Sequence, residues 1–93
     1  MAVSERMKVV LIAYCEGVDA NGLRSLSDDV KRGGLAWFPD EFAEAIKSGD
    51  FTPRKWEQFT NVLMDDDDDV LLDEYLRQVW SKAAPERPCP LDA

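Results

Sequence analysis

The sequence predicts an all-α fold, a compact bundle of about five short helices in a single domain. Apolar residues recur at spacings of three and four along most of the 93 residues, which is the period of a helix buried on one face. Glycine, proline and helix-capping residues separate these apolar stripes, and no alternating run or tight-turn pair typical of a hairpin is present. We therefore expect residues 1–84 to form one helical domain and the proline-rich residues 85–93 to form a flexible tail.

The first two helices are expected between Ser4 and the pair Gly33-Gly34. Ser4 can cap the first helix, and Gly17 stands where a glycine would end it. Apolar residues cover two faces of this helix: Met7, Val10, Leu11, Tyr14 and Val18 on one, and Val9, Ile12 and Ala13 on the other. Because a helix that is apolar on two sides needs neighbours on both, we expect it at the centre of the bundle. The second helix starts near Asp19, and its apolar stripe holds Leu23, Leu26 and Val30.

Three further helices have clear start and stop signals. Pro39 suits the first position of a third helix that ends before Gly49, and Thr52 followed by Pro53 starts a fourth. The last helix starts near Asp68, and prolines stop it from residue 85 onward. The expected buried faces hold Phe42, Ala45 and Ile46 in the third helix, Trp56, Phe59 and Leu63 in the fourth, and Leu72, Tyr75, Leu76, Val79 and Trp80 in the last.

Composition and charge exclude several classes of function. The formal net charge is −8, and nucleic acids and anionic membranes are themselves polyanions, so we expect neither as a direct partner. The absence of histidine excludes Ser-His-Asp and Cys-His catalysis and every histidine-containing metal site. Cys15 and Cys89 form no CxxC pair, and no apolar stretch is long enough to span a membrane. We expect a cytoplasmic protein with reduced thiols that is not an enzyme and binds no cofactor.

The acidic charge is concentrated in one short segment. Residues 1–34 carry five acidic and five basic side chains, so the whole net charge lies in residues 35–93. Between Glu57 and Leu76 there are eight acidic residues and no basic one. One or two aspartates at a helix N-terminus cap it and favour its dipole, but like charges one helical turn apart cost about 0.2–0.5 kcal/mol per pair. The run is therefore either a solvated cap and loop or a binding surface.

As a binding surface, this segment would present carboxylates to the lysines and arginines of a basic partner protein. The candidate contacts are Asp65, Asp66, Asp67, Asp68, Asp69, Asp73 and Glu74. Tight binding also needs buried anchors, and we expect these to be the aromatic residues Trp37, Phe38 and Tyr75, which lie near acidic residues in the sequence.

The aspartate run does not match the metal-binding patterns that it most resembles. Counted from Asp65 as an EF-hand loop, the sixth position is Val70 instead of glycine and the twelfth is Leu76 instead of glutamate. The run also fits the DDxxD pattern of metal-bound pyrophosphate chemistry, but 93 residues are too few to build the walls of such a pocket. A weak, adventitious cation site stays open as an alternative, and we expect no functional metal.

The second half of the sequence resembles a known type of protein. Phe42, Ile46 and Gly49 are followed by Thr52, Trp56 and Thr60-Asn61, then by the acidic stretch, then by Tyr75-Leu76 and Trp80. This arrangement, over residues 40–82, is similar to small acidic bacterial immunity proteins that neutralise colicin-like and contact-dependent growth inhibition toxins. The resemblance implies a helical protein that blocks the catalytic domain of its cognate toxin, often a basic nuclease, by occupying the groove for nucleic acid phosphates.

Two other functions fit the same residues. A phage-type nucleic-acid mimic, such as an anti-restriction or anti-CRISPR protein, would direct the carboxylates at a DNA-binding channel, and the identity of the neighbouring gene separates it from an immunity protein. A helical adaptor or regulatory subunit would use the aspartates only for solubility. Replacing residues 65–69 by asparagine would leave the binding of such an adaptor intact.

Overall fold

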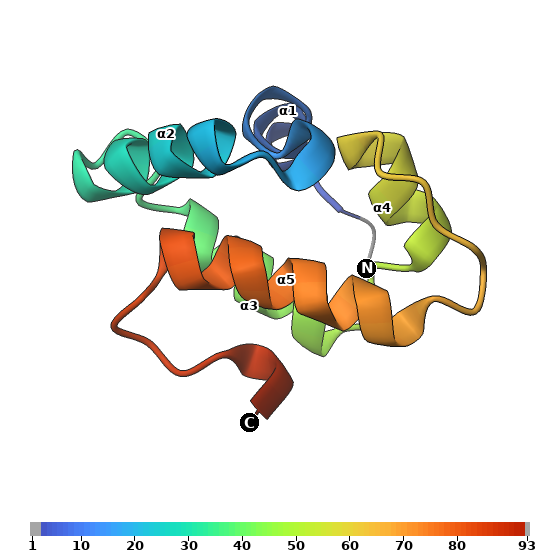
Figure 1. Cartoon of the computed structure of the whole chain (residues 1–93). Coiled ribbons are helices and arrows are strands. Elements are labelled where there is room, and N and C mark those ends of the chain that lie inside the picture. Colours follow the sequence, from blue (N-terminus) through green and yellow to red (C-terminus); the bar gives the residue numbers. More distant parts are fainter. Residues whose placement is uncertain (1–2, 93) are drawn as a thin grey trace.

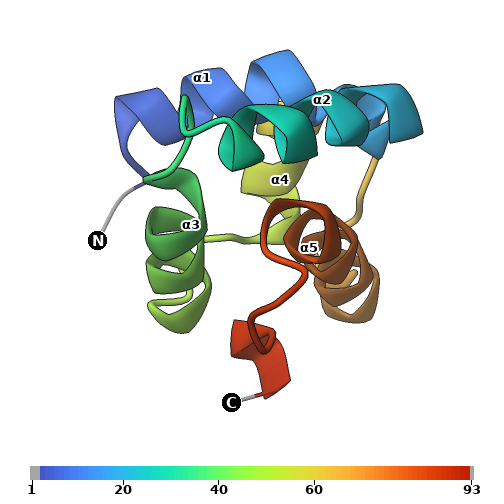
Figure 2. The same cartoon turned by 90° about the vertical axis from the view of Figure 1, so that its left-hand side faces the viewer.

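The computed structural model describes residues 3–92, which form five α-helices, two short 3₁₀-helices and no strand, so the predicted all-α fold is confirmed (Figure 1). Residues 1, 2 and 93 of the predicted domain and tail lie outside this range. In chain order the elements are α1 (Glu5–Tyr14), η1 (Glu16–Val18), α2 (Ala20–Lys31), α3 (Phe38–Lys47), α4 (Pro53–Thr60), α5 (Asp69–Ala83) and η2 (Pro90–Asp92). α1 and α2 lie above α3 and α5, and α4 lies beside α1 on the side away from α2 (Figures 1 and 2).

Local side-chain chemistry sets most of the helix starts. Ser4, Asp19 and Thr52 stand at the N-caps of α1, α2 and α4, and each side chain accepts a hydrogen bond from a backbone N–H two or three residues later. Pro39 and Pro53 occupy the first turns of α3 and α4, where no intrahelical donor is lost. The predicted starts of these four helices are confirmed. None of the helices among residues 3–92 is both long enough and apolar enough to cross a membrane.

An aromatic cluster joins α3, α4 and α5. Phe38 and Phe42 on α3 stack with ring centroids 5.1 Å apart, and Phe42 stacks on Trp80 of α5 at 6.4 Å. Phe51, in the link before α4, lies 5.3 Å from Phe42 and meets Trp56 of α4 edge-on at 5.6 Å. All five rings are buried, and each aromatic pair contributes about 0.5–1.5 kcal/mol beyond its buried area. The cluster fixes the two helices between which the acidic segment lies.

The expectation that α1 lies at the centre of the bundle is wrong. Met7, Val10 and Leu11 are buried on its first face, where α1 packs on α2, α3 and α4. On the second face, however, Val9 is 63% exposed and Ile12 is 56% exposed. The second face is thus open to water, so α1 lies at the outside of the described part of the chain (Figure 2).

A close junction holds α2 against the end of α1. Gly17 has φ +65° and Val18 has φ 49°, so the chain turns through two left-handed residues, of which the β-branched Val18 is the strained one. A Cβ on Gly22 would lie 2.2 Å from the carbonyl oxygen of Tyr14, so this approach requires glycine. The Tyr14 hydroxyl also donates a hydrogen bond to the Asp29 carboxylate, which raises the pKa of Tyr14.

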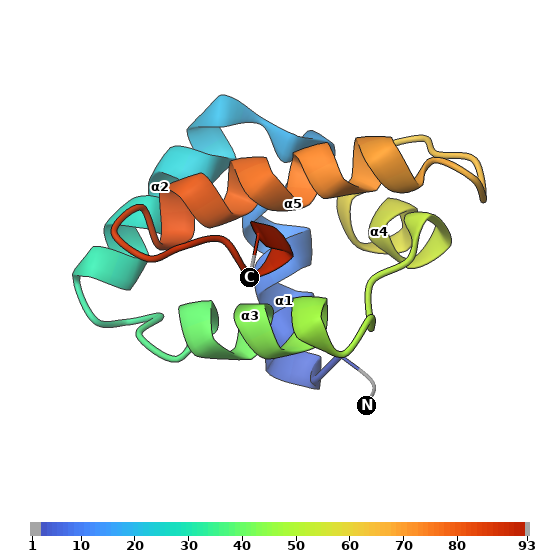
Figure 3. The same cartoon turned by 90° about the horizontal axis from the view of Figure 1, so that it is seen from below.

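Residues 85–92 differ from the expected flexible tail, because they fold back against α3 and α5 (Figure 3). Arg87 pairs with Asp40 on α3 at 2.9 Å, and its carbonyl oxygen accepts the Trp80 indole N–H at 3.1 Å. Asp92 in η2 pairs with Arg77 on α5 at 2.7 Å. The predicted boundary at residue 84 therefore does not separate this segment from the helical domain.

We expect Gly22→Ala to lower the free energy of unfolding by about 1–3 kcal/mol, because the added methyl group would overlap the Tyr14 carbonyl and push α2 away from α1. Gly34→Ala is the matched control, since its methyl group would lie 3.7 Å from the nearest atom, the Asp29 carbonyl oxygen, in ordinary contact. Urea denaturation of both variants measures the difference. Equal losses would contradict the close approach of the two helices.

The two cysteines should differ in reactivity. Cys15 is buried in the core, where burial raises the pKa of its thiol to about 12, whereas Cys89 is half-buried in the C-terminal segment. Because the thiolate is the reactive form, we expect a chromogenic thiol reagent at mildly alkaline pH to modify Cys89 in the folded protein and Cys15 only after denaturation. Folded Cys89→Ser should therefore be unreactive, and rapid modification of that variant would contradict the burial of Cys15.

Candidate functional site

The candidate site is built on the link between α4 and α5. The five aspartates, residues 65–69, which we call the acidic loop, occupy the end of this link and the first residue of α5 at one edge of the molecule (Figure 1). Asp68 is half-buried, and the other four are exposed. The carboxylates that the sequence singles out are therefore accessible to a partner.

The link begins because α4 ends earlier than predicted. The Thr60 hydroxyl donates to the Trp56 carbonyl oxygen at 2.8 Å, and Asn61 follows as a left-handed C-cap with φ 59°. Leu63 lies beyond this C-cap and is 86% exposed. Its prediction as part of the buried face of the fourth helix is wrong, because Asn61 turns the chain out of the helix before Leu63 can reach the core.

Carboxylates within and before the acidic loop hold it in shape. The Met64 backbone N–H donates to Glu57 at 2.9 Å, and the Asp65 N–H donates to the Asp68 carboxylate at 2.7 Å. The Asp68 N–H donates to the Asp65 carbonyl oxygen at 3.1 Å, which closes a turn. Asp68 stands at the N-cap of α5, but its side chain makes no cap hydrogen bond to that helix. It stabilises the loop instead of the helix end.

One basic side chain approaches the acidic loop from α4. Arg54, in the first turn of α4, pairs with Asp66 at 3.0 Å, and both side chains are exposed. An exposed pair of this kind contributes about 0–1 kcal/mol to stability. The segment from Glu57 to Leu76 contains no basic residue, so Arg54 adds one positive charge to its surroundings. The segment keeps a strong excess of negative charge.

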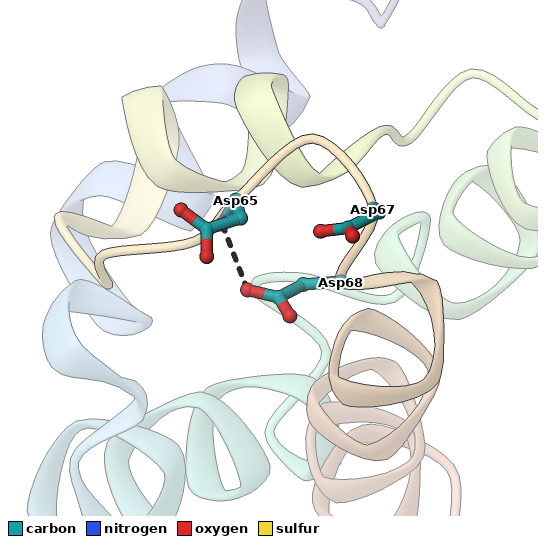
Figure 4. A group of neighbouring side chains, drawn as sticks. All are labelled: Asp65, Asp67 and Asp68. Carbon is teal, nitrogen blue, oxygen red and sulfur yellow. Dashed lines mark hydrogen bonds between the residues drawn. The ribbon is translucent and has the colours of Figure 1, made fainter.

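Three loop aspartates could approach a cation together. One carboxylate oxygen from each of Asp65, Asp67 and Asp68 lies within 4.8 Å of the others (Figure 4). Ca²⁺ takes six to eight oxygen ligands, so these three side chains would supply half of its coordination shell or less. One oxygen of Asp68 is already engaged with the Asp65 N–H. The arrangement matches the weak cation site left open by the sequence and carries no argument for a functional metal.

The acidic surface continues along α5 from Asp69, the last residue of the acidic loop, to two further carboxylates. Asp69, Asp73 and Glu74 are exposed on the first two turns of the helix. Asp69 and Asp73 are four residues apart, so they lie one turn apart on the same side. Asp69 also sits in the first turn, where the positive end of the helix dipole favours a negative charge. All seven carboxylates predicted as partner contacts thus lie on one continuous segment, residues 65–74.

None of the three predicted aromatic anchors is an exposed side chain. Phe38 is fully buried and stacks on Phe42, so its prediction as an exposed anchor is wrong: α3 begins here and directs this ring into the core. Trp37 is half-buried, and the Arg6 guanidinium lies over its ring, 4.3 Å from the ring centroid. Trp37 stands at the N-cap of α3, and this end of the helix is far from the α4–α5 link (Figure 3). Tyr75 is on α5 but is half-buried against the core.

Two aliphatic residues beside the acidic loop were not predicted as part of the site. Leu63 precedes the loop, and Val70 follows it in the first turn of α5 with 76% of its surface exposed. The available signal was their position on either side of the five aspartates: Val70 directly follows Asp69, and only Met64 separates Leu63 from Asp65. The helical spacing of apolar residues indicated the opposite, because it placed Leu63 on the expected buried face of the fourth helix.

Comparison with known proteins finds no relative: no family model, curated protein or solved structure matches the chain significantly.

We expect Phe38→Ala to lower the free energy of unfolding by about 3–5 kcal/mol, because it removes a fully buried ring that stacks on Phe42. Trp37→Ala is the comparison, since Trp37 is half-buried at the surface and should cost clearly less. Thermal or urea denaturation of the two variants measures both losses. A larger loss for Trp37→Ala would contradict the assignment of Phe38 to the core.

Proposed function

We propose that this chain is an acidic protein-binding inhibitor, and specifically an immunity protein that neutralises a cognate bacterial toxin in the cytoplasm. It would do so by occupying the substrate groove of the toxin's basic nuclease domain. The observation that carries the proposal is the acidic loop, whose exposed aspartates are held in a turn by hydrogen bonds between Asp65 and Asp68. A surface that is folded before it binds loses less conformational entropy on binding.

The charge distribution supports a basic partner. Residues 65–74 carry seven carboxylates and no basic side chain. Opposite charges on two proteins raise the association rate by about tenfold to a thousandfold at low ionic strength. Since a row of carboxylates carries the same sign of charge as nucleic acid phosphates, an inhibitor of this kind would compete with nucleic acid for the same lysines and arginines.

The side chains that could act as nucleophiles support binding in preference to catalysis. The chain contains no histidine to activate a nucleophile. The Cys15 thiol is buried, and its pKa of about 12 keeps it protonated at neutral pH. The acidic loop is open to solvent, so nothing there excludes water from a reacting group.

The test compares two variants with the same change in charge. The loop variant removes three aspartates and keeps Asp66 and Asp68, whose side chains make the contacts described above; its changes are Asp65→Asn, Asp67→Asn and Asp69→Asn. The control variant removes three exposed charges elsewhere, with Asp28→Asn, Glu44→Gln and Glu86→Gln. Both variants have the same net charge, so only the place of the lost charge differs.

Wild type and both variants are used to capture binding proteins from a lysate of the host bacterium. The captured protein is identified and purified, and the rate at which it associates with wild type and with each variant is measured at several salt concentrations. We expect the captured protein to be a basic toxin nuclease domain. At low salt it should associate with the loop variant about tenfold more slowly than with wild type, and with the control variant at the wild-type rate. Equal rates for wild type and loop variant would contradict the proposal and favour an adaptor. Capture of a restriction or CRISPR nuclease would instead identify a nucleic-acid mimic.

A further inference from the structure

Two strongly exposed aliphatic side chains flank the acidic loop. Leu63 is 86% exposed and Val70 is 76% exposed, and both exceed Val9 and Ile12, the large exposed apolar residues of α1. Leu63 precedes the loop with one residue, Met64, between them, and Val70 follows the loop directly. Folding leaves both side chains in water at the place where the chain is most highly charged.

Carboxylates surround Leu63. It lines a shallow hollow together with Glu57, Asp65 and Asp68. The buried Met64 beside it holds the backbone of this segment against the core, and its N–H is bonded to Glu57 at 2.9 Å. The backbone that carries Leu63 is therefore fixed, while its side chain projects beside acidic groups.

Carboxylates also surround Val70. Asp69 precedes it, and Asp73 and Glu74 follow it by three and four residues, which places them beside it on the surface of α5. An apolar residue bounded by polar ones is the arrangement of an interface centre and its rim.

Charge and apolar contact contribute differently to binding. Exposed ion pairs are screened by salt and add little lasting affinity, so carboxylates alone would give fast and weak association. Apolar side chains that become buried at the centre of an interface slow dissociation. The acidic loop and its two aliphatic neighbours together supply both properties.

On the basis of the proposed function, we propose that Leu63 and Val70 are the apolar anchors of the acidic loop, and that its partner is a basic groove with apolar or aromatic side chains between its lysines and arginines. A groove that binds single-stranded nucleic acid has this composition, because cations track the phosphates and apolar faces stack on the bases. Leu63 and Val70 would take the positions of bases, and the aspartates those of phosphates. A second copy of this chain does not fit the surface, because two acidic loops repel each other.

The test uses two synthetic peptides of equal length and lysine content as probes, one with leucines between the lysines and one with serines in their place. Affinities for the full chain are measured by fluorescence anisotropy at low salt, and amide NMR shifts locate the contact. The anchor variant is Leu63→Ser with Val70→Ser. The control variant is Val9→Ser with Ile12→Ser, which changes two exposed aliphatic residues away from the acidic loop.

We expect wild type and the control variant to bind the leucine peptide about tenfold more tightly than the serine peptide, with shifts at residues 63–74, and the anchor variant to lose this preference. An unchanged preference in the anchor variant, or its loss in the control, would overturn the anchor role and leave the acidic loop as a docking surface. Failure of wild type to bind either peptide would overturn the proposed function as well. Circular dichroism of each variant confirms that it remains folded.

Discussion

The position of the acidic loop depends on the aromatic stack between α3 and α5. Phe42 lies between Phe38 and Trp80 and also meets Phe51, which in turn meets Trp56 edge-on. Trp56 in the middle of α4 and Trp80 near the C-terminus of α5 thus belong to one buried cluster, which sets the two helices relative to each other and so the gap that their link spans. Because protein cores are closely packed and resist deformation, a loop anchored at both ends in this way keeps its place while its side chains face water.

The aspartates of the acidic loop have unequal roles. The Asp68 carboxylate accepts the Asp65 N–H, Asp66 pairs with Arg54, and Asp69 lies in the first turn of α5, where the helix dipole offsets its charge. Among the described residues, the side chains of Asp65 and Asp67 have no hydrogen-bond or ion-pair partner. Folding therefore accounts for three of the five charges. The repulsion added by the other two is offset by no contact with the side chains of the described residues.

The sequence predicts the helices well and their exposure less well. The starts of α1, α2, α3 and α4 follow from Ser4, Asp19, Pro39 and Thr52, because capping is decided by a few neighbouring atoms. The failures concern packing. Periodicity shows that α1 has two apolar faces but not how many helices surround it, so Val9 was expected to be buried. Periodicity also extended α4 to Leu63, although Asn61 ends it. The prediction of Phe38 as an anchor failed for the same reason, because Phe38 and Trp37 are adjacent in sequence and only tertiary packing separates a core ring from a half-buried one.

Exposed apolar surface alone does not select a binding site on this molecule, because two such surfaces are present. Val9 and Ile12 on α1 are next to Lys8, which pairs with Glu5 at 3.3 Å, so opposite charges there largely cancel. Leu63 and Val70, in contrast, lie beside the acidic loop, where negative charge is in strong excess. A basic partner is drawn toward the acidic loop before any apolar contact forms, since charge attraction extends over about 8–10 Å at moderate salt while apolar contact requires touching surfaces. The electrostatic difference between these two apolar surfaces thus decides which of them a basic partner would meet first.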